Sequence, residues 1–145
     1  FAADTAGEQM VEVLAQAARR GVAVHLVMDG VGTPALPADW TQRLETAGVQ
    51  WRIFQPLGRL GLLIPSRWRR LHRKLCVVDG RVAFCGGINV LDDWYDPNHG
   101  VLAAPRLDFA VRVTGPLVRE VHEVMVQFWW RLQAGRKARE ADWAT

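Results

Sequence analysis

The stretch HRKLCVVDGRVAFCGGIN, residues 72–89, holds two short apolar runs separated by Asp79-Gly80. Aspartate followed by glycine is typical of a two-residue type I′ turn, because both central positions of that turn need a positive φ angle. The stretch therefore predicts an antiparallel β-hairpin in which Val78 lies opposite Arg81.

The register of this hairpin determines which side chains are neighbours. Counting back from the turn places Lys74 opposite Cys85 and His72 opposite Gly87. Residues two apart in a strand point to the same face, so His72 and Lys74 share a face beside a glycine that cannot cover them. The same count makes Cys76 and Cys85 diagonal neighbours at roughly 7 to 8 Å, too far for an unstrained disulfide. We therefore expect two free thiols.

Two helix–strand units precede the hairpin. Thr5 and Glu8 can form a capping box, and the apolar residues that follow them recur at helical spacing. The run VAVHLVM that follows is rich in β-branched residues, as expected of a strand buried on both faces of a parallel sheet. The predicted elements are a helix from residue 5 to a stop at Gly21, a strand at 22–28, a helix from Pro37 to a stop at Gly48, and a strand at 49–54.

The rest of the chain completes the predicted fold. Residues 55–70 are predicted to form a long surface loop, since they contain prolines, glycines and clustered arginines and show no helical or strand periodicity. A polar loop at 92–100 leads to a strand at 107–113. A Gly-Pro pair then opens a last helix, whose apolar stripe ends before Gly135 and packs on the sheet. We therefore expect an α/β fold, with a mixed β-sheet flanked by helices.

Composition narrows the possible functions. With 145 residues, of which 50% are apolar and 23% charged, the chain has material for one packed domain spanning residues 1–145. The net charge of +3 suits an anionic partner without demanding one. No apolar stretch reaches the roughly 18 to 20 residues that a membrane-spanning helix needs. Because the first residue is Phe1 rather than Met, we read the chain as a fragment.

The hairpin also carries a spaced set of polar residues, which reads His72-x-Lys74, four residues, Asp79, six residues, then Gly86-Gly87-x-Asn89. A chance match to all six fixed positions has odds of roughly one in 100,000 from average residue frequencies. Cleaving a phosphodiester needs a nucleophile that is neutral at working pH and fixed cations or donors around the phosphoryl oxygens. An imidazole beside an ammonium and an amide supplies these groups. The set therefore indicates phosphoryl transfer.

The spacing matches the His-Lys-Asp motif of the phospholipase D superfamily, and residues 7 to 128 resemble the N-terminal half of bacterial cardiolipin synthases. The resemblance implies a phospholipase D-like half, with the first strand or strands and the second half of the fold missing from this chain. One departure is Gly86-Gly87, where many superfamily members carry Gly-Ser and thus a hydroxyl donor to the phosphate. The supporting segments are residues 18–30, 47–54, 67–74 and 107–116.

Each motif residue receives an expected role. His72, as the nucleophile, and Lys74 are predicted catalytic residues. Lys74, Asn89 and Gly87 are the predicted phosphate-binding residues. Asp79 belongs to the predicted catalytic set, but it sits in the turn about seven residues along the strand from His72. Direct chemistry by Asp79 is therefore geometrically doubtful, and we expect a supporting role.

A histidine nucleophile also needs an acceptor on its second ring nitrogen, which fixes the tautomer. Asp108 is the candidate for this orienting role, and a structural acid at a strand edge is the alternative. No histidine shares ligand spacing with a cysteine or an acid in a way that indicates zinc, and residues 92–100 lack the ligand periodicity of a calcium loop. We expect no metal and no cofactor.

Superfamily members attack with one motif histidine and protonate the leaving alcohol with another, and this chain contains a single such motif. The second histidine comes either from a missing C-terminal half or from a second subunit related by a twofold axis. The resemblance to cardiolipin synthases favours the missing half.

The resemblance implies a phosphatidyltransferase that acts on phosphatidylglycerol through a covalent phosphohistidine. The alternatives are a phospholipase D-like phosphodiesterase or nuclease with water as acceptor, and a non-catalytic half that binds lipid or phosphate. The expected partners are anionic phospholipids at a membrane surface, with no nucleic acid, and the expected location is the cytoplasmic side of a bacterial cell membrane, as a peripheral protein. The loop at 55–70, with leucines among arginines, suits either contact with such a surface or cover for the sheet edge.

Overall fold

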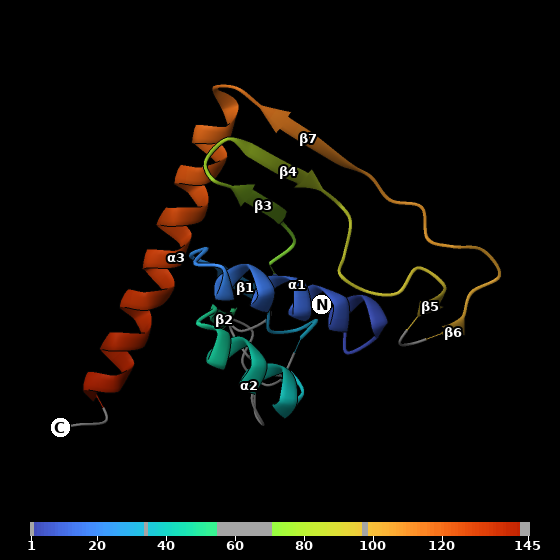
Figure 1. Cartoon of the computed structure of the whole chain (residues 1–145), viewed down its shortest axis with the longest axis horizontal. Helices are drawn as coiled ribbons and strands as arrows, with labels where there is room; N and C mark the ends of the chain where they lie inside the picture. The colour runs from blue at the N-terminus through green and yellow to red at the C-terminus, as the bar shows by residue number, and fades with distance from the viewer. Residues whose placement is uncertain (1, 34, 55–70, 97–98, 143–145) are drawn as a thin grey trace. The chain divides into compact units, whose positions relative to one another are not determined.

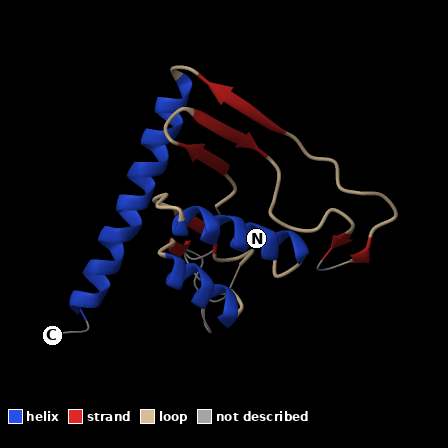
Figure 2. Cartoon of the chain, viewed as in Figure 1, coloured by secondary structure: helices blue, strands red, loops and turns tan. Residues whose placement is uncertain are grey.

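The structure is a computed structural model that describes residues 2–33, 35–54, 71–96 and 99–142. The loop predicted at 55–70 lies outside the described residues. Within the described residues, ten elements follow one another (Figures 1 and 2). They are α1 (Thr5–Arg19), β1 (His25–Asp29), α2 (Ala38–Ala47), β2 (Gln50–Phe54), β3 (Lys74–Val78), β4 (Val82–Gly86), β5 (Tyr95–Asp96), β6 (Gly100–Val101), β7 (Ala110–Thr114) and α3 (Leu117–Asp142).

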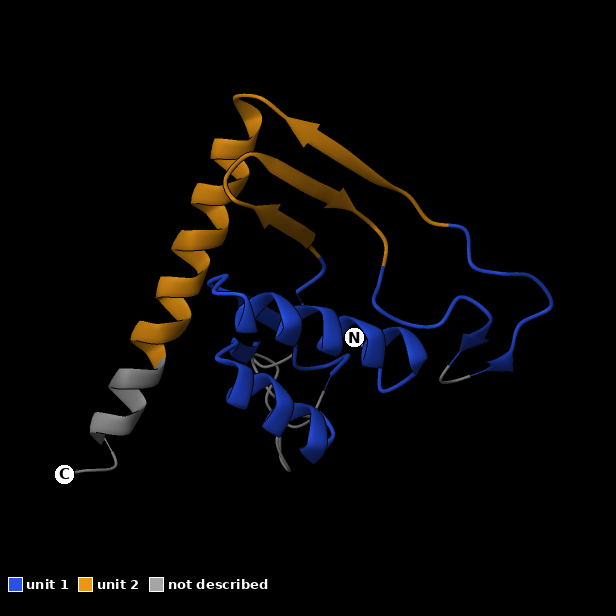
Figure 3. Ribbon diagram, viewed as in Figure 1, with its two compact units in different colours: residues 1–72, 89–107 blue, residues 73–88, 108–145 orange. Residues whose placement is uncertain are grey.

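The chain divides into two compact units, which Figure 3 colours separately. Unit 1 comprises residues 1–72 and 89–107, and unit 2 comprises residues 73–88 and 108–145. Parallel pairing occurs in unit 1 and antiparallel pairing in both units, with helices in each, so the predicted α/β class with mixed strand directions is confirmed. The assignment of residues 1–145 to one catalytic domain stays a prediction.

Unit 1 contains the two predicted helix–strand units. Strands β1 and β2 pair in parallel, from His25 opposite Gln50 to Asp29 opposite Phe54. Helix α2 ends at Gly48, whose φ of 88° lies in the left-handed region that favours glycine at a helix C-terminus. The helices pack through a buried cluster made of Val11, Trp40, Leu44 and Val49.

Strand β1 is less buried than its sequence predicts. Met28 is buried, whereas His25 at the start of the strand is exposed. Within the described residues β1 has a strand neighbour on one side only, so it lacks the cover of a central parallel strand. The prediction of a strand buried on both faces is therefore wrong.

Helix α1 begins one residue earlier than the predicted capping box. Asp4 is the N-cap, with an extended backbone, and its Oδ1 accepts the Gly7 N–H at 2.9 Å. Glu8 does not complete a box with Thr5, because its carboxylate accepts two hydrogen bonds from Arg43 of α2 at 2.7 and 2.9 Å.

The polar segment at 92–100 contains structure that its composition does not predict. Strands β5 and β6 form a small antiparallel pair, with Tyr95 opposite Val101. Arg106 closes the segment, since its guanidinium donates to Asp96 Oδ2 at 2.6 Å and its backbone N–H to Asp93 O at 2.9 Å.

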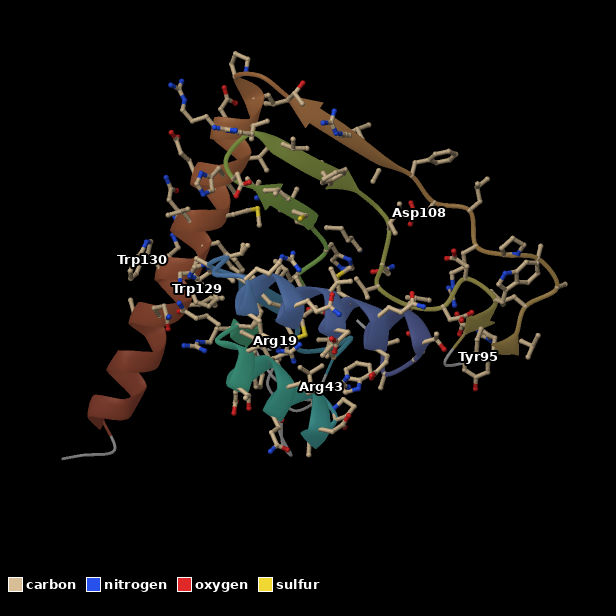
Figure 4. The ribbon with its side chains drawn as sticks, viewed as in Figure 1. Arg19, Arg43, Tyr95, Asp108, Trp129 and Trp130 are labelled. Atoms are coloured by element: carbon tan, nitrogen blue, oxygen red, sulfur yellow. The ribbon has the colours of Figure 1, made fainter. Side chains whose placement is uncertain are left out.

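Unit 2 is a three-stranded antiparallel sheet in the order β3-β4-β7, on which α3 packs. Trp129 of α3 is 8% exposed and Trp130 is 65% exposed, so the predicted apolar stripe does contain Trp129 (Figure 4). The helix continues beyond Gly135, before which the predicted apolar stripe ends, as far as Asp142. One glycine costs a helix about 1 kcal/mol, and the helix-forming residues on both sides of Gly135 outweigh that cost.

The hairpin turn forms as predicted, but the strand register differs by one residue. Asp79 and Gly80 have φ angles of 53° and 62°, and the Arg81 N–H donates to Val78 O at 3.0 Å. The first strand pair, however, joins Val78 to Val82. Arg81 is left over between the turn and the first pair, and every predicted pairing shifts accordingly.

The shift also separates the two thiols. Cys76 pairs with Phe84, and Cys85 pairs with Leu75. Adjacent rows of a sheet point to opposite faces, so the thiols are not the diagonal neighbours that the sequence predicts. Both cysteines are free, as expected.

Within the described residues, no helix combines the length and the apolar character needed to cross a bilayer.

Candidate functional site

The motif residues are divided between the two units. His72 and Asn89 belong to unit 1, and Lys74, Asp79 and Gly87 belong to unit 2. Asp108, the orienting candidate, also belongs to unit 2. The surroundings of each residue are therefore given within its own unit.

Lys74 is the first residue of β3 and is half-buried. It lies opposite Gly86, not opposite Cys85 as predicted, and Gly86 in turn lies opposite Ala110 of β7. A Cβ atom on Gly86 would collide with Phe109 O and approach Ala110 Cα to 2.5 Å. The first glycine of the motif is thus required by the close approach of β7, and it leaves the row beside Lys74 without a bulky side chain.

Gly87 lies against the carboxylate of Asp108, which Figure 4 labels just before β7. A Cβ atom on Gly87 would collide with Asp108 Oδ1 and lie 2.8 Å from Oδ2. The Gly87 N–H donates to Phe109 O at 3.0 Å, and Asp108 Oδ1 accepts the Phe109 N–H at 2.7 Å. The structure therefore brings the second motif glycine and the orienting candidate together.

Asp79 occupies the turn of the hairpin, where it is exposed. It lies five positions after Lys74, which is roughly 16 Å of extended strand. On the helix side of the turn, His122 Nδ1 lies 3.8 Å from the position of a Cβ atom on Gly80. This position fits a role in the turn and not in contact with a phosphate bound at Lys74.

His72 is exposed and lies two residues before the start of β3, so it is not paired opposite Gly87 as predicted. The residue before it is held in place, because the Leu71 N–H donates to Asp29 Oδ1 at 2.9 Å. Asp29 is the last residue of β1 and belongs to the same unit.

Asn89 is exposed, and the residues that follow it are tied to the start of the chain. The Ala2 N–H donates to Val90 O at 2.9 Å. The Asp92 N–H donates to Asp4 Oδ2 at 2.6 Å, and Asp4 also caps α1. Both motif positions of unit 1 are therefore flanked by backbone groups that other segments hold.

Sequence reasoning missed Asp29 and Asp4. A signal for Asp29 was present, because a carboxylate directly after an apolar parallel strand stands at the edge where the carboxyl ends of such strands meet. Asp4 also stood in a readable position, as an N-cap type of residue three places before Gly7. That these side chains hold Leu71 and Asp92 depends on tertiary contacts that no local pattern contains.

Among the described residues, no group of three or more histidine, cysteine or acidic side chains is arranged to hold a metal ion. Partial burial raises the pKa of the Cys76 thiol above its ordinary value, which favours the protonated form. A thiol in that form is a poor nucleophile.

A protein-family model described as "Cardiolipin synthase, PLD-like domain" matches residues 2–105, a span that contains every motif position from His72 to Asn89. The chain belongs to this family. The phospholipase D-like resemblance in the sequence is thereby confirmed. Asp108 lies outside the matched span.

Curated relatives of this phospholipase D-like domain carry the name cardiolipin synthase. Cardiolipin synthase B of Escherichia coli strain K12 is 34% identical over 139 residues, which covers 88% of this chain and 32% of the relative. Cardiolipin synthase B of Salmonella typhi is 36% identical over the same shares of each chain. Cardiolipin synthase A of Pseudomonas fluorescens strain Pf-5 is 37% identical over 130 residues, covering 88% of this chain and 26% of the relative.

The chain thus spans about a third or less of the length of these relatives. No solved structure matches it significantly.

Proposed function

We propose that this chain supplies one His-Lys-Asp motif of a phosphatidyltransferase of the cardiolipin synthase type, with phosphatidylglycerol as its substrate. The family match over residues 2–105, with all motif positions inside it, carries the proposal. The names of the curated relatives support the same reaction class.

In the proposed reaction, a ring nitrogen of His72 attacks the phosphorus of one phosphatidylglycerol. The bond from phosphorus to the glycerol oxygen breaks, and glycerol leaves after taking a proton from the second motif histidine. A hydroxyl of a second phosphatidylglycerol then attacks the phosphatidyl-histidine, gives its proton to the second histidine, and releases His72 and cardiolipin. Such a sequence gives ping-pong kinetics.

Lys74 supports this chemistry through its charge and its surroundings. An ammonium group next to the phosphoryl oxygens offsets the negative charge that builds up during attack. The glycines at 86 and 87 keep the neighbouring row free of side chains, and backbone N–H groups and Asn89 are donors of the kind that a phosphate takes. Asp108 is assigned the orienting role beside Gly87.

The second histidine is proposed to lie in another part of the full-length protein, outside this chain. Anionic phospholipid at the cytoplasmic face of a bacterial membrane is the proposed partner and location, with the protein bound peripherally. The proposed steps use no cofactor, because His72 supplies the nucleophile and Lys74 supplies the positive charge beside the phosphoryl oxygens.

The test uses the full-length protein that contains this chain, incubated with phosphatidylglycerol vesicles, with the lipid products identified by mass spectrometry. We expect cardiolipin from the native protein and none from His72→Ala. His99→Ala is the matched control, since His99 is an exposed histidine outside the motif, and it should retain native activity.

Other products would redirect the proposal. Phosphatidic acid without cardiolipin would identify water as the acceptor and a lipid hydrolase as the activity. Absence of any lipid product from the native protein would contradict the proposal and favour a nucleic-acid substrate or a binding role.

A further inference from the structure

We propose that Asp29 is a positioning residue that holds the backbone in front of His72 in the conformation needed for nucleophilic attack. The inference rests on the proposed function of His72. It adds a residue that lies 43 positions before the histidine in the sequence and outside the His-Lys-Asp motif.

The Asp29 carboxylate uses its two oxygens on two different segments. Oδ1 accepts the Leu71 N–H at 2.9 Å, and Oδ2 accepts the Gly32 N–H at 2.9 Å. The backbone oxygen of Asp29 accepts the Thr33 N–H at 2.8 Å, and Thr33 is 3% exposed. One residue therefore ties the turn after β1 to the backbone that leads into the motif.

Asp29 itself is firmly placed. It is paired with Phe54 as the last residue of the parallel ladder, and the Gly30 N–H donates to Phe54 O at 2.8 Å. Its carboxylate therefore projects from a fixed end of the sheet. A support of this kind transmits position better than a residue on a free loop would.

Fixing Leu71 constrains His72 directly. Consecutive Cα atoms are about 3.8 Å apart, and only the backbone dihedrals between the two residues remain adjustable once the Leu71 peptide is held. His72 is itself exposed, so little packing restrains its side chain. Displacing a reacting group by about 1 Å can cost about 100-fold in rate. Loss of the hydrogen bond that holds Leu71 is therefore expected to lower the rate of attack by His72.

The ionised carboxylate suits this task better than a neutral amide. Each backbone N–H makes a charge-assisted hydrogen bond with it, and such bonds are shorter and stronger than neutral ones. Asparagine has a single side-chain acceptor oxygen, which cannot occupy both the Oδ1 position that Leu71 uses and the Oδ2 position that Gly32 uses. Asp29→Asn therefore removes one of the two bonds with almost no change in side-chain size.

The experiment measures kcat and KM for cardiolipin formation by the full-length protein, together with hydrogen exchange at the Leu71 amide. For Asp29→Asn we expect kcat to fall about 10- to 100-fold, KM to change by less than about twofold, and the Leu71 amide to exchange faster. Asp39→Asn makes the same chemical change on an exposed carboxylate of α2 and should leave all three quantities at native values.

A second variant covers the case in which Asp29→Asn does not fold. Asp29→Glu keeps the charge and both oxygens but moves them by one methylene, so we expect a smaller fall in kcat at native KM. Native kcat in either folded variant, with faster Leu71 exchange, would overturn the positioning role and leave the proposed function intact. A native protein that forms neither cardiolipin nor phosphohistidine would overturn the proposed function and this inference with it.

Discussion

At the scale of single residues, Gly87 and Asp108 form a pair in which the missing side chain of one makes room for the carboxylate of the other. Each residue could be selected from the sequence, Gly87 from the motif and Asp108 as an acidic residue in the strand predicted at 107–113. Their contact could not be predicted, because it depends on the pairing of β4 with β7, two strands separated in sequence by the segment at 87–109. Serine at position 87 would meet the same carboxylate.

This contact predicts energetic coupling between the two positions. Gly87 has no positive φ, so Gly87→Ala adds a methyl group without backbone strain. With Asp108 present we expect a loss of about 1 to 2 kcal/mol in the free energy of unfolding, as for overpacking in general. With Asp108→Ala the same change should cost less, leaving a coupling of about 0.5 kcal/mol or more in a urea-unfolding double-mutant cycle. Additive effects would show that the carboxylate turns away at no cost.

At the scale of elements, the helices and strands were largely readable from the sequence, whereas their ends and registers were not. The Asp79-Gly80 turn was predicted from its dipeptide, but the extra residue Arg81 depends on how β3 and β4 meet beyond the turn. The N-cap of α1 is Asp4, whose carboxylate accepts the Gly7 N–H. Glu8, the predicted partner in a capping box, binds Arg43 of α2 instead. Local chemistry therefore determined which elements form, and contacts between elements determined their limits.

Glycines inside helices provide a matched test of packing between elements. A Cβ atom on Gly7 of α1 would collide with Ala2 O and lie 2.8 Å from the Trp40 ring, whereas a Cβ atom on Gly135 of α3 meets none of the described residues within 4 Å. Gly→Ala in an open helix position gains about 1 kcal/mol. We expect Gly135→Ala to raise the thermal midpoint. Gly7→Ala should lower it, because overpacking costs about 1 to 3 kcal/mol of unfolding free energy, of which the helix gain offsets only a part.

Calorimetry or circular dichroism of the two variants measures this contrast. A rise in the thermal midpoint of both variants would mean that Trp40 moves aside without a loss of packing energy. That outcome would also call into question the tight packing of α1 on α2.

At the scale of the whole molecule, unit 1 is assembled from two stretches that the hairpin separates in the sequence. Asp4 fastens them, since it caps α1 through Gly7 and also accepts the Asp92 N–H. The sequence did not reveal this second use, because a cap signal is local and Asp92 is 88 residues away.

The two uses of Asp4 can be separated by experiment. Asparagine caps helices about as well as aspartate, but its single acceptor oxygen cannot hold both amides. For Asp4→Asn we therefore expect native hydrogen exchange at the Gly7 amide and exchange about 10-fold faster at the Asp92 amide, whereas Asp4→Ala should speed both. Equal protection at Asp92 in the native protein and Asp4→Asn would contradict the bridging role.

The bonds from Ala2 to Val90 and from Asp4 to Asp92 also bear on how the chain folds as it is made. They span 88 residues, and at about 5 to 20 residues per second a ribosome needs roughly 4 to 18 seconds to add that many. During that interval α1 lacks these two long-range bonds. The entropy cost of closing so long a loop must be offset by the contacts that form at its ends. The start of α1 therefore gains these two bonds only after residues 90–92, which directly follow Asn89, have been synthesised.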